Sequence, residues 1–200
     1  MKLHYAGASP FVRKVLVVAH ELNLADQITL STLAVTPVNP VDALNQANPL
    51  GKIPALELDD GMVLFDSRVI TAHLNDVGGG ALLPAAGWAR LQAQVFEAMG
   101  DGMNDAMVLT RYETFLRPEE LRWNDWIEQQ LGKAKRAMDH LESNVDQLST
   151  LTIGSISIAC ALAYADFRFP DLGWRDGRTN LAAWYADIAQ RQAMQSTAPG

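Results

Sequence analysis

The stretch from Asn48 to Leu56, Asn-Pro-Leu-Gly-Lys-Ile-Pro-Ala-Leu, constrains the fold of this chain more than any other segment. Ile53 is β-branched and precedes a proline, which pushes its backbone toward the extended region and allows a cis bond at Pro54. We therefore expect the N–H and C=O groups of Ile53 to be left unpaired at the start of a strand. Extended backbone of this kind can pair with a bound peptide as an additional strand.

A second stretch, from Leu64 to Ile70, follows after a short turn. The segment from Ala55 to Phe65 predicts two strands joined by an Asp-Asp-Gly turn that favours a hairpin. The hairpin leads to Asp66 and Ser67 at the start of a helix, where Ser67 is expected to be the N-cap. A helix N-terminus binds carboxylates, and the Asp66 carboxylate can hold an ammonium group. The pair therefore suits the α-amino-acid end of a peptide.

The two stretches, in this order, resemble the glutathione-binding segment of the cytosolic glutathione S-transferases, in particular the bacterial members with a serine in the N-terminal motif. The resemblance covers nearly the whole chain, including the run Asn-Leu-Ala-Ala-Trp-Tyr from Asn180 to Tyr185. It implies an α/β thioredoxin-like N-terminal domain, an all-α C-terminal helical domain, glutathione as co-substrate and a homodimer.

Local patterns agree with this layout. In the first part of the chain they predict strands at Lys2–Tyr5 and Ile28–Leu33 and helices after Ser9, near Val41 and from Ser67. Three glycines at 78–80 predict a linker. The expected domains are a thioredoxin-like glutathione-binding domain at 1–77, a linker at 78–86, and an all-helical domain with a hydrophobic substrate pocket at 87–200.

The second part of the chain predicts helices throughout. They are expected from Trp88 to about Phe115, from Pro118 onward, from Ser155 to about Phe167, and from Asn180 to about Gln195. In the family that the chain resembles, the buried helix begins with Ser or Thr followed three residues later by Asp. Ser155 fits the first position, but Ile158 occupies the second, so we expect a cap with only one of its two hydrogen bonds.

Ser9 and Tyr5 are the two candidates for the group that activates the sulfur of glutathione. In the family, a Tyr, Ser or Cys in this region hydrogen-bonds the sulfur. A thiol with a pKa of about 8.5 is mostly protonated at neutral pH, and the thiolate is the nucleophile. A hydroxyl donor, the positive end of the helix at Pro10 and nearby Arg13 all favour the thiolate. We expect Ser9 to be the donor; the alternatives are Tyr5 as donor and Ser9 as a plain helix cap.

The other glutathione contacts follow from the resemblance and from local chemistry. The backbone of Ile53 and Pro54 is expected to pair with the cysteinyl residue. Lys52 is expected either to pair with the glycyl carboxylate or to remain a solvated surface residue. Phe11 is assigned to the same site by the resemblance, together with Asp66, Ser67 and Ser9.

A stripe of methionines at helical spacing indicates where a second substrate could bind. Methionine side chains adapt to varied shapes, which suits a pocket for an apolar electrophile. Met103, Met107 and the nearby Arg111 are therefore the candidate lining of the hydrophobic substrate pocket. The same spacing is also typical of core packing.

The composition excludes other classes of function. A formal net charge of −7 argues against a nucleic-acid or anionic-membrane binder. The single cysteine, Cys160, rules out an internal disulfide and fits a reducing compartment. The N-terminus lacks the apolar core of a signal peptide, so we expect a cytoplasmic protein without a membrane span. The four histidines show no metal-ligand spacing, so no metal is expected.

These patterns predict a detoxification enzyme that conjugates the thiolate of glutathione to small hydrophobic electrophiles. Serine at position 9 argues against disulfide exchange, because serine cannot form a mixed disulfide. Two alternatives remain open. One is a non-catalytic protein of the same fold that binds a small molecule or a protein partner, and the other is a glutathione-dependent peroxidase.

Overall fold

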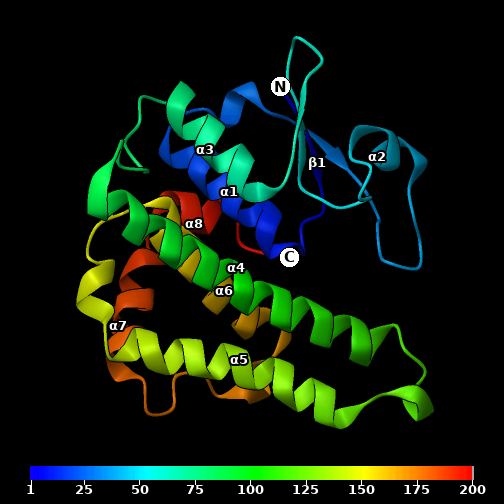
Figure 1. The fold of residues 1–200 in the computed structure, drawn as a ribbon, viewed down its shortest axis with the longest axis vertical. Helices are drawn as coiled ribbons and strands as arrows, with labels where there is room; N and C mark the ends of the chain where they lie inside the picture. Colours follow the sequence, from blue (N-terminus) through cyan, green and yellow to red (C-terminus); the bar gives the residue numbers. More distant parts are fainter. Residues whose placement is uncertain (200) are drawn as a thin grey trace. The chain divides into compact units, whose positions relative to one another are not determined.

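The computed structural model describes residues 1–199, which form two compact units. The first unit comprises residues 1–93 and the C-terminal segment from Gln192 onward, and the second comprises residues 94–191. Figure 1 shows the elements of both units. The division falls inside helix α4 (Gly87–Phe115) rather than in the linker expected at residues 78–86.

A four-stranded sheet forms the centre of the first unit. Its strands are β1 (Lys2–Tyr5), β2 (Thr29–Thr32), β3 (Ala55–Glu57) and β4 (Val63–Leu64). They lie in the order β2-β1-β3-β4, with β1 parallel to β2 and antiparallel to β3, and β3 antiparallel to β4. The predicted strand–helix–strand order and the predicted hairpin are therefore confirmed.

Amphipathic helices supply the core of the first unit. They are α1 (Pro10–Glu21), α2 (Asp42–Ala47), α3 (Ser67–Val77) and α8 (Gln192–Ser196), while a 3₁₀ helix (Ala25–Gln27) between α1 and β2 buries no residue. Helices α1 and α3 lie side by side (Figure 1). Ile70 and Leu74, four residues apart on one face of α3, are fully buried, as is Val15 on α1. The small α/β layer that the sequence predicts is thus built on apolar residues at helical spacing.

The segment between α3 and α4 is anchored rather than loose. Asn75, near the end of α3, is 2% exposed, and its Oδ1 accepts hydrogen bonds from the N–H groups of Leu82 and Leu83, each at 2.9 Å. Both leucines are buried. This part of the predicted linker therefore packs as part of the first unit.

The end of the chain differs from the single helix predicted for Asn180 to Gln195. Helix α7 (Thr179–Ile188) ends at Ile188, and α8 begins at Gln192 in the first unit. Arg13 of α1 helps to hold α8, because its guanidinium donates to the main-chain oxygen of Met194 at 3.0 Å. Arg13 is only 8% exposed, and a buried cation needs such acceptors. Its role in this structure is to bind α8.

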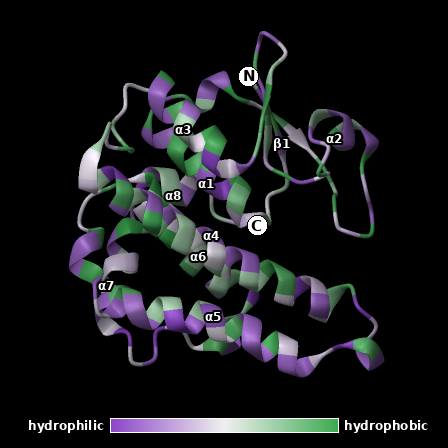
Figure 2. Cartoon of the chain, in the orientation of Figure 1, coloured by the Kyte–Doolittle hydropathy of each residue, from purple (hydrophilic) through white to green (hydrophobic). Residues whose placement is uncertain are grey.

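The second unit consists of helices. They are the part of α4 from residue 94, a 3₁₀ helix (Glu119–Leu121), α5 (Asn124–Glu142), a 3₁₀ helix (Val145–Leu148), α6 (Ile153–Arg168), a 3₁₀ helix (Pro170–Leu172) and α7. Helix α6 is the core element, since every residue from Ile153 to Ala165 is buried. Along α5, Figure 2 shows hydrophilic and hydrophobic residues interleaved, and its fully buried members are Ala134, Met138 and Leu141.

Two predicted helix starts in the second unit are wrong. Residues after Pro118 form only a 3₁₀ turn, and α5 begins later, at Asn124. The N-cap of α6 is Thr152, and Ser155 is its N3 residue. Thr152 Oγ1 accepts from the Ser155 N–H at 3.2 Å and Ser155 Oγ accepts from the Thr152 N–H at 2.8 Å. The capping box is therefore complete, and Ile158 has no part in it.

Helices α4 and α6 approach closely at Gly100. A Cβ atom at this position would lie 2.5 Å from the Ser157 hydroxyl oxygen and 2.6 Å from its carbonyl carbon. Ser157 also donates to Asp101 Oδ1 at 2.9 Å. The glycine is thus required by packing between the helices.

In the part of the chain that the structure describes, no helix is both long and apolar enough to cross a membrane.

Candidate functional site

Three segments of the first unit meet at one end of the sheet. β1 ends there and leads through a turn to Ser9. Because β3 is antiparallel to β1, the start of β3 and the preceding Ile53 lie at the same end. Because β4 is antiparallel to β3, it also ends there and leads into Asp66. We call this region the site end of the sheet, and it brings together residues that are far apart in the sequence.

Ser9 is the N-cap of α1, as predicted. Its Oγ accepts a hydrogen bond from the Val12 N–H at 3.3 Å, and Pro10 fills the first helical position, where a missing N–H is not needed. The hydroxyl hydrogen of Ser9 makes no hydrogen bond to a residue that the structure describes. It is therefore available to an anion at the positive end of α1.

Tyr5 lies at the end of β1, and its hydroxyl reaches over the turn that follows. A Cβ atom at Gly7 would lie 2.9 Å from the Tyr5 hydroxyl oxygen. The side chain is half-buried, and within residues 1–199 its hydroxyl has no hydrogen-bond partner. Both candidates for the sulfur donor, Tyr5 and Ser9, therefore belong to the same turn and both can donate.

The loop before Ile53 is held by Asn48, a residue that the sequence patterns did not single out. Asn48 is 2% exposed, its Nδ2 donates to the Lys52 carbonyl at 2.8 Å, and its Oδ1 accepts from the Leu50 N–H at 3.0 Å. Gly51 in this loop has a φ of 62°, which side chains adopt only with strain. An Asn-Pro pair is typical of a turn, but the burial of the Asn48 amide depends on the fold.

Ile53 leaves this loop with its main chain unpaired. The peptide bond between Ile53 and Pro54 is cis, and β3 begins at Ala55. Neither the N–H nor the C=O of Ile53 is hydrogen-bonded to a residue in the described part of the chain. Unpaired backbone directly before a strand is available to a bound peptide, as the sequence predicts.

Asp66, and not Ser67, is the N-cap of α3. The Asp66 Oδ1 accepts from the Arg68 N–H at 3.0 Å, and its carboxylate is exposed. Ser67 is the first helical residue and is 2% exposed. The first N–H groups of a helix have no partner within the helix, so the start of α3 offers donors for an anion beside an exposed carboxylate for a cation.

The remaining predicted glutathione contacts lie in the same unit. Lys52 is exposed and forms no ion pair with a residue that the structure describes. Phe11 is half-buried in the first turn of α1. Lys52 therefore supplies an unpaired positive charge next to Ile53.

The candidate pocket residues of α4 divide into two kinds. Met103 and Met107 are 2% and 0% exposed and belong to the apolar core of the second unit, together with Met138 and Leu162. Such burial is that of packing residues and not of a pocket wall open to solvent. Arg111 is half-buried and therefore reaches the surface.

Neither a metal nor a cysteine contributes to this arrangement. Within residues 1–199, no group of three or more His, Cys, Asp or Glu side chains is placed to hold a metal ion. Cys160 is fully buried in α6.

An open cleft of about 340 Å³ lies in the second unit, lined by Leu148, Trp184, Asp187 and Ile188 among others, and none of the predicted site residues lines it.

The fold and the site end define a class of protein. A thioredoxin-like layer is followed by a helical unit. The first unit has an unpaired backbone segment before β3 and a helix start beside an acidic cap, two features that suit pairing with a small peptide. The comparisons with known proteins agree. The chain matches the families described as "Glutathione S-transferase, N-terminal domain" over residues 8–77 and "Glutathione S-transferase, C-terminal domain" over residues 124–187.

The chain belongs to the glutathione S-transferase family. It is 32% identical to the uncharacterized GST-like protein YibF of Escherichia coli K12, over 100% of this chain and 98% of that protein. A glutathione transferase family member from Pseudomonas fluorescens Pf-5, solved with bound glutathione, is 47% identical with a TM-score of 0.98, over 100% and 98% of the two chains. Another structure of a family member from that organism, with bound S-(propanoic acid)-glutathione, is 44% identical with a TM-score of 0.93, over the whole of both chains.

Proposed function

We propose that this protein binds glutathione at the site end of the sheet and conjugates it to small electrophiles. The observation that carries the proposal is the convergence of Ser9, Ile53 and Asp66 at that end. Glutathione is a tripeptide with an ammonium group, two carboxylates and a thiol, and each has a suitable counterpart among these segments.

The main chain of the tripeptide would pair with Ile53, whose N–H and C=O are unpaired in the described chain. Its α-ammonium group would pair with the exposed Asp66 carboxylate and its α-carboxylate with the N–H groups at the start of α3. Lys52 would pair with the glycyl carboxylate. With these contacts the thiol would lie toward the turn that carries Ser9 and Tyr5.

The chemical step is attack by the thiolate on an electrophilic carbon. The thiol gives up its proton, and the sulfur forms a bond to the carbon. Either a leaving group departs with its bonding electrons or, at an activated double bond, the neighbouring carbon takes up a proton. The Ser9 hydroxyl and the N-terminus of α1 stabilise the thiolate, which lowers the thiol pKa toward neutral pH. A family member of 44% identity bound to a glutathione that carries propanoic acid on its sulfur supports thioether chemistry.

Calorimetric titration of glutathione into wild type and into Asp66→Asn tests the binding site. The lost charge-assisted contact should weaken binding about 10- to 100-fold. Asp60→Asn is the matched control, because Asp60 is also exposed and its carboxylate also accepts from the N–H two residues on, that of Met62, at 2.9 Å. Wild type that does not bind glutathione, or equal effects of the two substitutions, would contradict the site.

Turnover is measured separately, by a spectrophotometric conjugation assay with several electrophiles. Glutathione binding without turnover on any of them would indicate a binding protein of this fold rather than a transferase. Family membership also leads us to propose a homodimer, which analytical ultracentrifugation of the wild type checks directly.

A further inference from the structure

The side-chain amide of Asn48 acts on the peptide group between Lys52 and Ile53. Its Nδ2 donates to the Lys52 carbonyl oxygen at 2.8 Å, while its Oδ1 accepts from the Leu50 N–H at 3.0 Å. An amide nitrogen cannot accept a hydrogen bond, so the bond from Leu50 fixes which end of the Asn48 amide is the oxygen. The other end is therefore a donor, and it is held against the Lys52 carbonyl.

This contact sets the direction of the Ile53 N–H. The Lys52 C=O and the Ile53 N–H belong to one peptide group, which is trans, since the cis bonds of the described chain follow Ile53 and Phe65. In a planar trans peptide the C=O and the N–H point in opposite directions. Because the carbonyl points toward the Asn48 amide, the N–H points away from it. The hydrogen bond to the carbonyl also polarises the peptide group and makes the N–H a stronger donor.

The Ile53 N–H is oriented in this way without a partner in the chain. It is not hydrogen-bonded to any residue that the structure describes, and β3 begins only at Ala55. The sheet therefore does not account for its direction. The Asn48 amide holds one side of this peptide group and leaves the other side available to a bound acceptor.

Asn48 is itself anchored to the core of the first unit. It follows α2, and its N–H donates to the Leu44 carbonyl at 2.7 Å. Leu44 is fully buried, and Asn48 is 2% exposed. The Asn48 carbonyl accepts from the Gly51 N–H at 2.8 Å, so both main-chain groups and both ends of the side-chain amide are engaged. The packing of Leu44 thus fixes the amide, and the amide fixes the Ile53 N–H.

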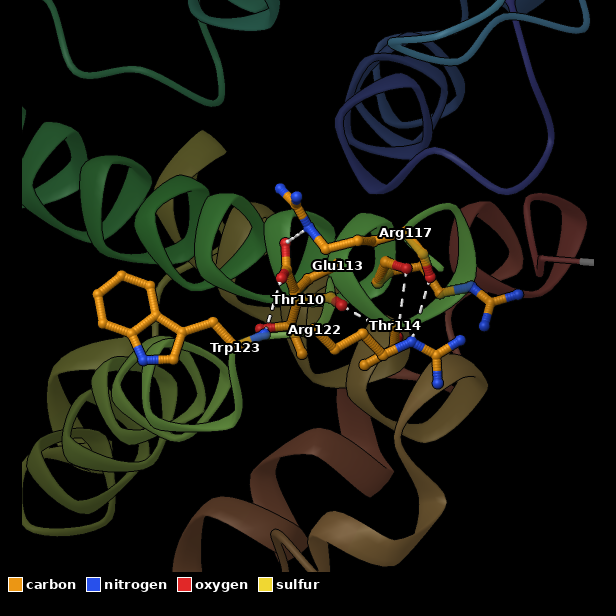
Figure 3. A network of polar contacts seen from close by, with 7 residues as sticks. Thr110, Glu113, Thr114, Arg117, Arg122 and Trp123 are labelled. Atoms are coloured by element: carbon orange, nitrogen blue, oxygen red, sulfur yellow. Dashed lines mark hydrogen bonds and ion pairs between the residues drawn. The ribbon is translucent and has the colours of Figure 1, made fainter. Parts of the chain in front are cut away.

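A contact of the same kind in the second unit lacks this consequence. Arg122 Nε donates to the Arg117 carbonyl at 3.2 Å, beside the two hydrogen bonds that Glu113 accepts (Figure 3). The peptide group after Arg117 ends on Pro118, which has no N–H. The contact can therefore hold the turn after α4 but cannot orient a donor. It supplies a natural comparison for Asn48.

We propose that Asn48 is a positioning residue for glutathione, which directs the Ile53 N–H at the cysteinyl carbonyl oxygen of the bound tripeptide. Asn48 does not touch the ligand and acts through the peptide group between Lys52 and Ile53. The inference rests on the proposed function, because the acceptor belongs to bound glutathione.

Three thiol ligands test this role by calorimetric titration. Glutathione and γ-glutamylcysteine both have an acceptor oxygen on the cysteinyl carbonyl carbon, whereas γ-glutamylcysteamine lacks this carbonyl and the glycine. All three keep the amide N–H that would pair with the Ile53 C=O. Asn48→Ala should weaken the binding of the first two ligands about 3- to 10-fold, the value of one hydrogen bond. It should leave the affinity for γ-glutamylcysteamine unchanged.

Asn48→Ser separates the two contacts of the amide and keeps the test valid if the alanine variant does not fold. A serine hydroxyl can still accept from the N–H two residues on, that of Leu50. It is one atom shorter than the amide and does not reach the Lys52 carbonyl. Asn48→Ser should therefore lose less stability than Asn48→Ala in denaturant titrations, but the same factor in affinity for glutathione.

Two control variants remove comparable contacts elsewhere. Asn75→Ala is matched for burial, because Asn75 is also 2% exposed in the first unit and its Oδ1 also accepts from the main chain. Arg122→Met removes the donor to a carbonyl that has no N–H beyond it. Both variants should keep the wild-type affinity for all three ligands, whatever stability they lose.

The outcomes separate the role of Asn48 from the glutathione site itself. General damage to the loop would weaken all three ligands alike. Losses of equal size for γ-glutamylcysteine and γ-glutamylcysteamine, or an unchanged affinity for glutathione in Asn48→Ser, therefore overturn the positioning role and leave the glutathione site standing. Failure of wild type to bind glutathione overturns both.

Discussion

Replacement of Ser9 tests the chemical step, provided that the contribution of Ser9 to the start of α1 is separated from its contribution to the thiolate. As an N-cap, Ser9 accepts from the Val12 N–H over 3.3 Å, which is longer than the usual 2.7–3.2 Å. We therefore expect the loss of the cap to cost about 0.5 kcal/mol, at the low end of the range for such residues. As a donor to a charged sulfur, the same hydroxyl should contribute about 1.5–3 kcal/mol. That energy corresponds to about one to two units in the pKa of the bound thiol.

Ser9→Ala removes both contributions, whereas Ser9→Gly removes the hydroxyl and costs the helix start only a few tenths of a kcal/mol. In both variants the pKa of bound glutathione, followed by thiolate absorbance across pH, should rise by about one to two units. The kcat/KM at neutral pH should fall about 10- to 100-fold. Tyr5→Phe deletes the rival hydroxyl without touching the cap and should change neither quantity. A thiol pKa that rises in Tyr5→Phe and stays constant in Ser9→Gly would refute the assignment and make Tyr5 the donor.

Two further predictions concern stability. Gly100→Ala should lower the free energy of unfolding by about 1–3 kcal/mol, because the new methyl group would lie 2.5 Å from the Ser157 hydroxyl oxygen. Gly102→Ala, with nothing within 4 Å of its new Cβ, should raise the free energy of unfolding by up to about 1 kcal/mol. Denaturant titration measures this free energy for both variants, and a Gly100→Ala variant more stable than wild type would contradict the close helix contact. In the sheet, hydrogen bonds from a lysine and a histidine of β1 lower the pKa of Glu57 below 4.5. The charged Glu57 carboxylate therefore stabilises the folded state above the ordinary pKa, and this stabilisation is lost as pH falls through the lowered pKa. As pH falls below about 5, Glu57→Gln should therefore lose less stability than wild type, whereas the control Asp26→Asn, at an exposed site, should follow wild type. Melting temperatures measured across pH test this, and the same change of melting temperature with pH in all three proteins would exclude this role of Glu57.

Much of the fold was predictable because its signals are local. Ser9-Pro10 predicts a capped helix from two neighbouring residues, and the Asp-Asp-Gly turn predicts the hairpin. Asp66 and Ile53 were found in the same way, since a residue before proline and a residue at a helix start have backbone requirements that their neighbours set. The order of strands is not a local property, because β2 and β3 follow each other in the chain but lie on opposite sides of β1.

The features that the sequence did not predict have identifiable physical causes. Thr152 and Ser155 are three residues apart, and either can cap a helix, so only the observed hydrogen bonds show that Thr152 is the cap and Ser155 its N3 partner. Arg13 was assigned to the sulfur from its nearness in sequence, but its guanidinium binds the carbonyl of Met194 at the other end of the chain. Met103 lies in the core of the second unit, because helical spacing identifies a buried stripe without showing what covers it; its place in a substrate pocket stays a prediction. The outcomes for Arg13 and Met103 depend on contacts between distant segments, whereas the cap depends on which of two neighbouring hydroxyls is placed at the start of the helix.

The difference between local signals and distant contacts also distinguishes the binding of glutathione from the binding of the second substrate. Recognition of a peptide backbone uses N–H and C=O groups, and their availability is set by local features such as the proline after Ile53. Choice of the second substrate depends on side chains, and helical spacing does not show which of them are covered. Met103 and Met107 share the spacing of a pocket lining, yet both are buried in the core of the second unit. Local sequence patterns therefore predict the peptide site more directly than the site of the electrophile.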